Sequence, residues 1–247
     1  MDEIKKFAAL NNARVIIFIP GYHSTFEKSS KRLAQIAYDI KSNSKLNLIP
    51  ILFSWPSQGK LDGYKKDEEA IKLSEINLQA LLLELASNLN NAQLYVVAHS
   101  MGNRASLGSL RAIAEVNPEA LPKFTRVIAI APDVDSNFFK LELGPIIFKS
   151  KISVTLYASS ADEILKISEK EHHAPRLGQS GRHLTVMDGL ETIDASYVHT
   201  DFLGHSYYKK GPVIEDIIEI LNGKIAPKMR SNLIEGDIGV GKYWVIK

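Results

Sequence analysis

The most constraining feature of this sequence is the alternation of short, strongly apolar runs with longer amphipathic segments. The short runs are rich in Val and Ile, and most lack polar alternation, as is typical of strands covered on both faces. They predict strands at residues 14–19, 48–53, 94–98, 126–131 and 152–158, with a weaker sixth at 190–195. Helical apolar periodicity lies between them, at 27–40, 68–89, 101–116, 161–172 and 212–221. This order predicts an α/β protein with a mostly parallel sheet and helices on both faces.

The chain carries no signal of a boundary between domains. Its 247 residues contain no repeat, no low-complexity tract and no Pro/Gly/Ser-rich linker, so we expect one domain over 1–247. Residues 1–13 read as an N-terminal extension and 224–247 as a C-terminal tail. The tail glycines lack the Lys-Ser/Thr ending of a phosphate loop, so we expect a turn that leads to a short terminal strand. The ends of the elements within 138–148 are not defined by the pattern.

Composition and charge exclude several kinds of chemistry. The 30 basic and 28 acidic side chains nearly balance, which gives no electrostatic basis for nucleic-acid binding. The absence of cysteine excludes disulfides, thiol nucleophiles and thiolate metal sites, and it fits a reducing cytoplasm. No stretch approaches the roughly 18 apolar residues that span a bilayer, and the N-terminus lacks the apolar core of a signal peptide. We expect a cytoplasmic protein with no transmembrane segment, no metal and no cofactor.

Ser100 lies in a tight turn between an expected strand and an expected helix, in the sequence Ala-His-Ser-Met-Gly at 98–102. This pattern matches the nucleophile elbow G-x-S-x-G, with Ala98 at the first glycine position. Small residues are needed there because neighbouring segments pass very close to the turn. The start of a helix would aim the N–H of Met101 at an oxyanion formed beside the serine. The alternative is that Ser100 only caps the helix.

A serine nucleophile needs a base and an acid that orients the base. Asp162 directly follows the strand at 152–158 and is the favoured acid, because the acid of this kind of site usually follows a late strand. Asp133 is the rival, one strand earlier. A purely structural role is the alternative for either residue, and Asp162 in particular suits the first turn of a helix, where the helix dipole stabilises an acid.

Five histidines follow Ser100, and His205 is the favoured base. It is flanked by Gly204 and Ser206 in a loop before the last long helix, and His199 is the runner-up. His172 and His173 are too near Asp162 in sequence to form a separate arm, and adjacent side chains diverge, which disfavours a metal site. His183 lies in a loop rich in Gly, Arg and Ser.

The loop after the first strand is expected to complete the site. Gly21 allows the backbone to approach a substrate, and the N–H of Tyr22 supplies the second oxyanion donor. His23 and His99 are expected to line the same cleft. Trp55 follows the second strand, where it either forms an apolar wall beside the substrate or packs under the loop.

The collected segments resemble a prokaryotic α/β-hydrolase family of unknown function. The resemblance runs from about Val15 to the HSYY segment at 205–208 and rests on GYHSTF, FSWPSQGKLDGYKKDEEA, AHSMGNR, APDVD, LYASSADEIL and LGHSYY. AHSMG is shared by many hydrolases, whereas its combination with FSWPS.G and LYASSAD is far more specific. The resemblance implies a three-layer α/β-hydrolase fold and a triad of Ser100, Asp162 and His205.

Two positions depart from the family pattern. The family usually has His before the loop glycine, where this chain has Pro20, and Asn after the Gly-Tyr pair, where it has His23. Both lie at the expected oxyanion hole and leave the triad untouched. Only 18 residues (134–151) separate Asp133 from the next strand, so we expect an open or lightly covered site without a large cap domain.

These observations predict a serine hydrolase of carboxylesterase type that acts on a small-molecule ester through an acyl-enzyme. Ester cleavage is the least demanding reaction for such a site, and thioesters, amides and acyl transfer stay open. The alternative is a hydrolase-fold binding or scaffold protein with weak or no catalysis. The sequence does not indicate the oligomeric state.

Overall fold

An eight-stranded, mostly parallel sheet runs through the molecule. The computed structural model describes residues 1–9, 13–198, 203–209, 211–239 and 241–247. The strand order is β2-β1-β3-β4-β5-β6-β8-β7, and only β7 runs antiparallel, against β8. The strands are β1 (Arg14–Ile19), β2 (Leu48–Leu52), β3 (Gln93–His99), β4 (Phe124–Ile130), β5 (Val154–Ala158), β6 (Leu190–Asp194), β7 (Leu233–Asp237) and β8 (Lys242–Ile246). The carboxyl ends of the parallel strands therefore meet at one edge.

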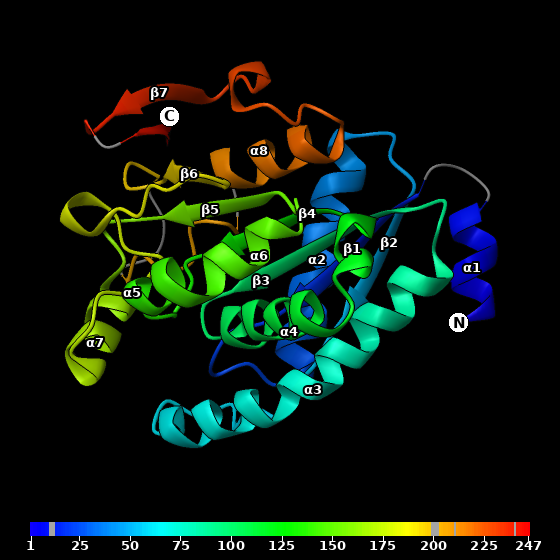
Figure 1. The fold of residues 1–247 in the computed structure, drawn as a ribbon, viewed down its shortest axis with the longest axis horizontal. Coiled ribbons are helices and arrows are strands. Elements are labelled where there is room, and N and C mark those ends of the chain that lie inside the picture. Colours follow the sequence, from blue (N-terminus) through cyan, green and yellow to red (C-terminus); the bar gives the residue numbers. More distant parts are fainter. Residues whose placement is uncertain (10–12, 199–202, 210, 240) are drawn as a thin grey trace.

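Helices cover both faces of this sheet. They are α1 (Asp2–Ala9), α2 (Phe26–Asn43), α3 (Tyr64–Asn88), α4 (Gly102–Val116), α5 (Ser136–Phe138), α6 (Gly144–Lys149), α7 (Glu163–His172) and α8 (Pro212–Leu221). Figure 1 shows α3 and α4 in front of the sheet and α2 behind it. Short 3₁₀ turns lie at Pro118–Lys123, Gly181–His183 and Pro227–Met229.

The strand β1 shows why the sheet has a core on each face. Val15, Ile17 and Ile19 belong to the cluster that contains the apolar side chains of α3 and α4. Ile16 and Phe18, which point the other way, pack in the cluster with α2 and α8. Because successive side chains of a strand alternate, a continuous apolar run is needed to bury both faces.

The structure confirms the expected α/β architecture and places all six expected strands in one sheet. It adds a strand that the sequence pattern did not indicate, because Leu233–Asp237 forms a hairpin with the expected terminal strand. That terminal strand, β8, pairs in parallel with β6. The residues expected to form a tail therefore extend the central sheet.

The segment between β4 and β5 is a short helical run and contains no cap domain. The helix α5, one π-helical turn (Phe139–Leu143) and α6 follow one another directly. Phe139 and Ile147 are buried in the same core as α4. This run packs beside α4, and its short length agrees with the expected absence of a large cap domain.

Buried charges tie the C-terminal residues to the sheet. Arg230 is fully buried and donates to Asp216 Oδ2 at 3.0 Å and to Glu191 Oε1. Tyr157 also donates to Asp216 Oδ2. Burial, only partly offset by Arg230, raises the pKa of Asp216 from its ordinary 3.8 to about 6.

This raised pKa predicts a pH-dependent stability. The folded state binds the Asp216 proton more tightly than the unfolded chain, so the contribution is fully present below pH 3.8 and is lost as the pH rises through about 6. Between pH 3 and 7, the wild type is expected to lose about 3 kcal/mol of unfolding free energy relative to Asp216→Asn. Denaturant unfolding of both proteins across this range measures the difference, and parallel pH profiles would contradict the assignment.

Candidate active site

Ser100 lies between β3 and α4 in a strained backbone conformation. Its φ is 53°, in the left-handed region that residues other than glycine rarely adopt. The Ser100 N–H donates to the Ile130 carbonyl at 2.9 Å, and its carbonyl accepts from the N–H groups of Asn103 and Asp133 at 3.1 and 3.2 Å. Such strain persists only where surrounding bonds hold it, and it is concentrated at functional sites.

Asn103 stabilises this turn through hydrogen bonds, a role that the sequence did not indicate. Its side chain is fully buried, and Nδ2 lies within 3.1–3.2 Å of the carbonyl oxygens of Ala98, Ser100 and Ile130. One amide group thus joins the end of β3, the turn and the end of β4. The available sequence signal was an asparagine in the first turn of the expected helix, three residues after Ser100.

Two glycines allow the loop after β1 to touch the turn. A Cβ on Gly102 would lie 2.5 Å from the Pro20 carbonyl oxygen and 2.6 Å from that of Ile19. A Cβ on Gly21 would lie 2.7 Å from the Ser100 Cβ. Gly21 therefore sits directly beside Ser100, and close approach to the turn explains both glycines.

Gly102→Ala is expected to destabilise the protein by about 1–3 kcal/mol, because the new methyl group overpacks two backbone carbonyls that have little room to move. Thermal unfolding of the wild type and the variant measures this loss. Gly144→Ala is the matched control at the start of α6, where the nearest atom to a new Cβ lies at 3.1 Å. Equal behaviour of the two variants would contradict the tight contact at Gly102.

Asp162 and His205 form a direct hydrogen bond. His205 Nδ1 lies 2.7 Å from Asp162 Oδ2, and the Asp162 side chain is fully buried. Asp162 Oδ1 accepts the N–H of Leu165 at 3.0 Å, so this carboxylate also caps α7. A carboxylate at Nδ1 keeps the proton on that nitrogen and leaves Nε2 as the basic atom.

The loop that carries His205 is held against the Asp162 turn. Leu203 accepts the N–H of Glu163 at 3.0 Å, and Gly204 has a φ of 65°. A Cβ on Gly204 would lie 2.2 Å from the Ala161 carbonyl oxygen, so only glycine permits this approach. His199, the alternative base, lies outside the described residues.

His99, the residue before Ser100, contacts His205 at the carboxyl edge of the sheet. The His99 ring centroid lies 4.7 Å from that of His205, and His99 Nε2 lies 3.1 Å from the His205 carbonyl oxygen. Within the ranges that the structure describes, no hydrogen bond joins the Ser100 hydroxyl to the His205 imidazole. Bonds of this kind are often long without substrate and tighten when it binds.

Asp133, the rival acid, belongs to a different network. Its carboxylate accepts from Tyr64 at 2.6 Å, Ser168 at 2.5 Å, Arg176 at 2.9 Å and Arg104 at 3.0 Å. Burial opposes ionisation, but the two guanidinium groups outweigh it and lower the pKa of Asp133 to about 2. Among the described residues, Asp133 thus has four side-chain partners, none of which is a histidine.

The backbone N–H groups of Met101 and Tyr22 are unpaired within the part of the chain that the structure describes. Met101 is fully buried, and an unpaired N–H at a buried position is rare in folded proteins. The Tyr22 side chain points elsewhere, with its hydroxyl on the Leu61 carbonyl and its ring in an edge contact with Tyr64.

Asp67 fixes the shape of the loop after β1, a role that the sequence pattern did not predict. The carboxylate is fully buried and accepts from the His23 N–H at 3.3 Å, the Ser57 hydroxyl at 2.6 Å and the Gln58 N–H at 2.6 Å. His23 has a φ of 59°, and its Nε2 lies 3.3 Å from Lys28 Nζ. The segments after β1 and β2 are therefore joined by one acid at the start of α3.

Trp55 packs under the loop after β1. Its side chain is buried, and its indole N–H donates to the Pro20 carbonyl oxygen at 2.8 Å. This is the second of the two roles that the sequence left open, and it fixes the position of Pro20 next to the turn.

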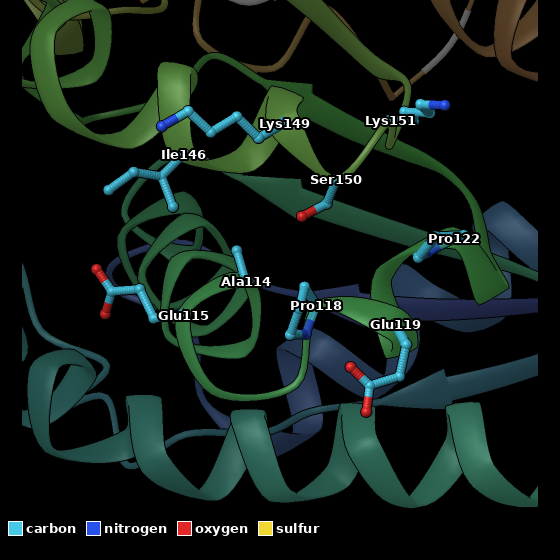
Figure 2. Close-up of a pocket in the computed structure, with 9 residues that line it drawn as sticks. All are labelled: Ala114, Glu115, Pro118, Glu119, Pro122, Ile146, Lys149, Ser150 and Lys151. Atoms are coloured by element: carbon cyan, nitrogen blue, oxygen red, sulfur yellow. The ribbon is translucent and has the colours of Figure 1, made fainter.

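Surface hollows lie away from Ser100. One, with a volume of about 560 Å³, is lined by residues from the C-terminal end of α4, the Pro118–Lys123 turn and the end of α6. Its lining residues are Ala114, Glu115, Pro118, Glu119, Pro122, Ile146, Lys149, Ser150 and Lys151. Figure 2 shows how these residues lie. Since Ala114 is 14 residues beyond Ser100 on a helix that rises about 1.5 Å per residue, the hollow is roughly 20 Å away. Another, of about 460 Å³, lies at the amino ends of β5 and β6.

No group of three or more potential metal ligands occurs within the part of the chain that the structure describes. The described helices also include none with the length and apolar character that a bilayer crossing requires.

The sheet order, the helices on both faces and the strand–turn–helix at Ser100 define an α/β-hydrolase fold. Residues 2–223 match the family described as "Alpha/beta hydrolase of unknown function (DUF900)", and the chain belongs to this family. No curated protein matches the chain.

Solved structures resemble this chain at low sequence identity. Aspergillus fumigatus lipase B has a TM-score of 0.54 at 12% identity, over 87% of this chain and 54% of the lipase. This chain thus spans about half the length of that lipase. The phospholipase PlaB from Legionella pneumophila has a TM-score of 0.46 at 12% identity, over 95% and 67% of the two chains. A dienelactone hydrolase from Anabaena variabilis has 0.49 at 14% identity, over 87% and 86%.

Proposed function

We propose that this protein is a serine hydrolase that cleaves small carboxylic esters through an acyl-enzyme. The observation that carries the proposal is the 2.7 Å hydrogen bond between Asp162 and His205, at the edge of the sheet where Ser100 sits in a strained turn. A serine that only caps a helix needs neither a strained turn nor a nearby Asp–His hydrogen bond. The chain order Ser, Asp, His is the order of this fold.

In the proposed mechanism, Ser100 Oγ attacks the ester carbonyl carbon while His205 Nε2 takes the hydroxyl proton. Asp162 holds the imidazole with Nδ1 protonated and stabilises the imidazolium that forms. The N–H groups of Met101 and Tyr22 bind the negative oxygen of the tetrahedral intermediate. The intermediate collapses to the acyl-enzyme and expels the alcohol, which receives the proton from His205. Water, deprotonated by His205, then releases the carboxylic acid and restores Ser100.

The surroundings of Asp162 and Asp133 support this assignment of roles. Asp162 has one oxygen on His205 and one on a helix N-terminus, which leaves its charge available to the imidazole. Asp133 is paired with Arg104 and Arg176, and its role in the proposal is structural. The contacts of Trp55 and Gly21 likewise support a role in shaping the cleft rather than in chemistry.

Hydrolysis of nitrophenyl esters of graded acyl length tests the proposal, with matched thioesters and anilides to define the bond cleaved. The short helical run between β4 and β5 leads us to expect turnover of soluble short-chain esters without a lipid surface. Ser100→Ala serves as the blank. If the wild type and this variant hydrolyse no ester above the buffer rate, the proposal is wrong and the binding or scaffold role becomes the better account.

A further inference from the structure

The His99 side chain connects the nucleophile turn to the loop that carries His205. His99 Nε2 lies 3.1 Å from the His205 carbonyl oxygen. Its ring contacts two rings of that loop in tilted arrangements, with centroid distances of 4.7 Å to His205 and 4.4 Å to Tyr208. The other ring nitrogen lies near the loop after β1, because a Cβ on Gly21 would lie 3.1 Å from His99 Nδ1.

The chemistry of this contact fixes the tautomer of His99. A carbonyl oxygen only accepts hydrogen bonds, so Nε2 carries the hydrogen and donates it. Burial lowers the pKa of His99 well below its ordinary 6.5, and the nearby His205, Lys209 and Arg32 lower this pKa further. The hydrogen bond to the His205 carbonyl raises the pKa but does not offset these effects. The ring is therefore neutral, and its Nδ1 carries no hydrogen.

The loop at 203–208 is thus held from two sides. On one side, Asp162 binds the His205 imidazole and Glu163 binds the Leu203 carbonyl. On the other side, His99 donates to the His205 carbonyl, and the Tyr207 hydroxyl donates to the Tyr157 carbonyl at 2.8 Å. Tyr208 supports the His99 ring and is itself covered by the Arg32 guanidinium of α2 at 5.8 Å.

We propose that His99 is a positioning residue, whose Nε2–H bond to the His205 carbonyl holds the imidazole of His205 in reach of Ser100. The proposal rests on the proposed hydrolase function for its catalytic consequence, whereas the anchoring itself is a property of the fold. It gives His99 a task other than the substrate contact expected from the sequence. His99 needs to touch neither substrate nor reacting atoms for this task.

Three variants test the proposal. His99→Leu removes the donor and keeps an apolar side chain, and His99→Gln keeps an amide N–H that reaches the Nε2 position. Thr192→Val, in β6, is the matched control because it also removes a buried side-chain hydrogen bond to a backbone carbonyl. In the wild type, the Thr192 hydroxyl donates to the Thr185 carbonyl oxygen at 2.6 Å. Each variant is compared with wild type by thermal unfolding, by kcat and KM on a nitrophenyl ester, and by the NMR signal of the His205 Nδ1 proton.

For His99→Leu, we expect kcat to fall about 10–100-fold with KM nearly unchanged, since small misplacement of a catalytic group has effects of this size. The His205 Nδ1 proton signal is expected to broaden or shift upfield. His99→Gln should retain most of kcat and the signal, and Thr192→Val should retain both. The proposal is overturned if His99→Leu matches Thr192→Val in kcat and in the NMR signal, or if His99→Gln is as impaired as His99→Leu. If the wild type hydrolyses no ester, the proposed function fails, and the NMR comparison alone still decides whether His99 anchors His205.

Discussion

Ser100→Ala is expected to reduce kcat/KM for ester hydrolysis by at least about 10⁴-fold, because removal of the nucleophile of a triad leaves only binding and oxyanion stabilisation. The fold should be retained, since the bonds that hold the Ser100 turn come from its backbone and from Asn103. Stability is expected to rise slightly or stay unchanged. Initial rates on a nitrophenyl ester and thermal unfolding of the same preparation measure both quantities.

Ser106→Ala is a suitable comparison for this variant. Ser106 is fully buried on α4, and its hydroxyl has no hydrogen-bond partner among the described residues. Its loss should leave kcat/KM within a few-fold of wild type. Activity retained in Ser100→Ala, or lost equally in both variants, would rule out Ser100 as the nucleophile.

Asp162→Asn is expected to lower kcat by about 10³–10⁴-fold with little change in KM. An asparagine that keeps its oxygen on the Leu165 N–H must present its Nδ2 to His205, and a donor at Nδ1 moves the ring proton to Nε2. The imidazole can then no longer accept the Ser100 proton. Steady-state kinetics between pH 6 and 9 measure this loss.

Asp133→Asn provides the contrast because it alters the other buried acid. Removing its charge leaves the buried Arg176 without a carboxylate partner, whereas Arg104 keeps Glu68, and the loss is expected to cost about 3–5 kcal/mol of unfolding free energy. The folded fraction should keep kcat within about tenfold of wild type, because Asp133 contacts Ser100 through its backbone N–H. If the folded Asp133→Asn protein loses kcat as Asp162→Asn does, the two acids have been assigned the wrong way round.

The fold was largely predictable because its signals are local. Buried parallel strands need continuous apolar runs, and the run at 14–19 coincides with β1. The helix at 212–221 coincides with α8 for a similar reason, since its Pro at the first position and its apolar period are both visible in the sequence. The strand β7 was missed because its side chains are mostly exposed, so burial imposes no pattern on it.

The supports of the site were harder to predict than its reactive groups. Ser100, Asp162 and His205 follow a recognisable order of residue types after strands. Asp67 looks in sequence like one more acid on the solvated face of a helix, yet it is fully buried by groups that lie about 10 and 44 residues away. Its role depends on two loops meeting, and no local pattern encodes that meeting. The same holds for Arg176, whose partner Asp133 is 43 residues distant.

The central claim is that Ser100 is a nucleophile activated by the pair Asp162–His205. Intact-mass analysis and peptide mapping after reaction with a fluorophosphonate test it most directly, because this reagent forms a stable adduct only with an activated hydroxyl. The account predicts one adduct per chain on the peptide that contains Ser100, with none in Ser100→Ala and much slower formation in His205→Ala. An adduct on another residue, or equal labelling of wild type and Ser100→Ala, would contradict it.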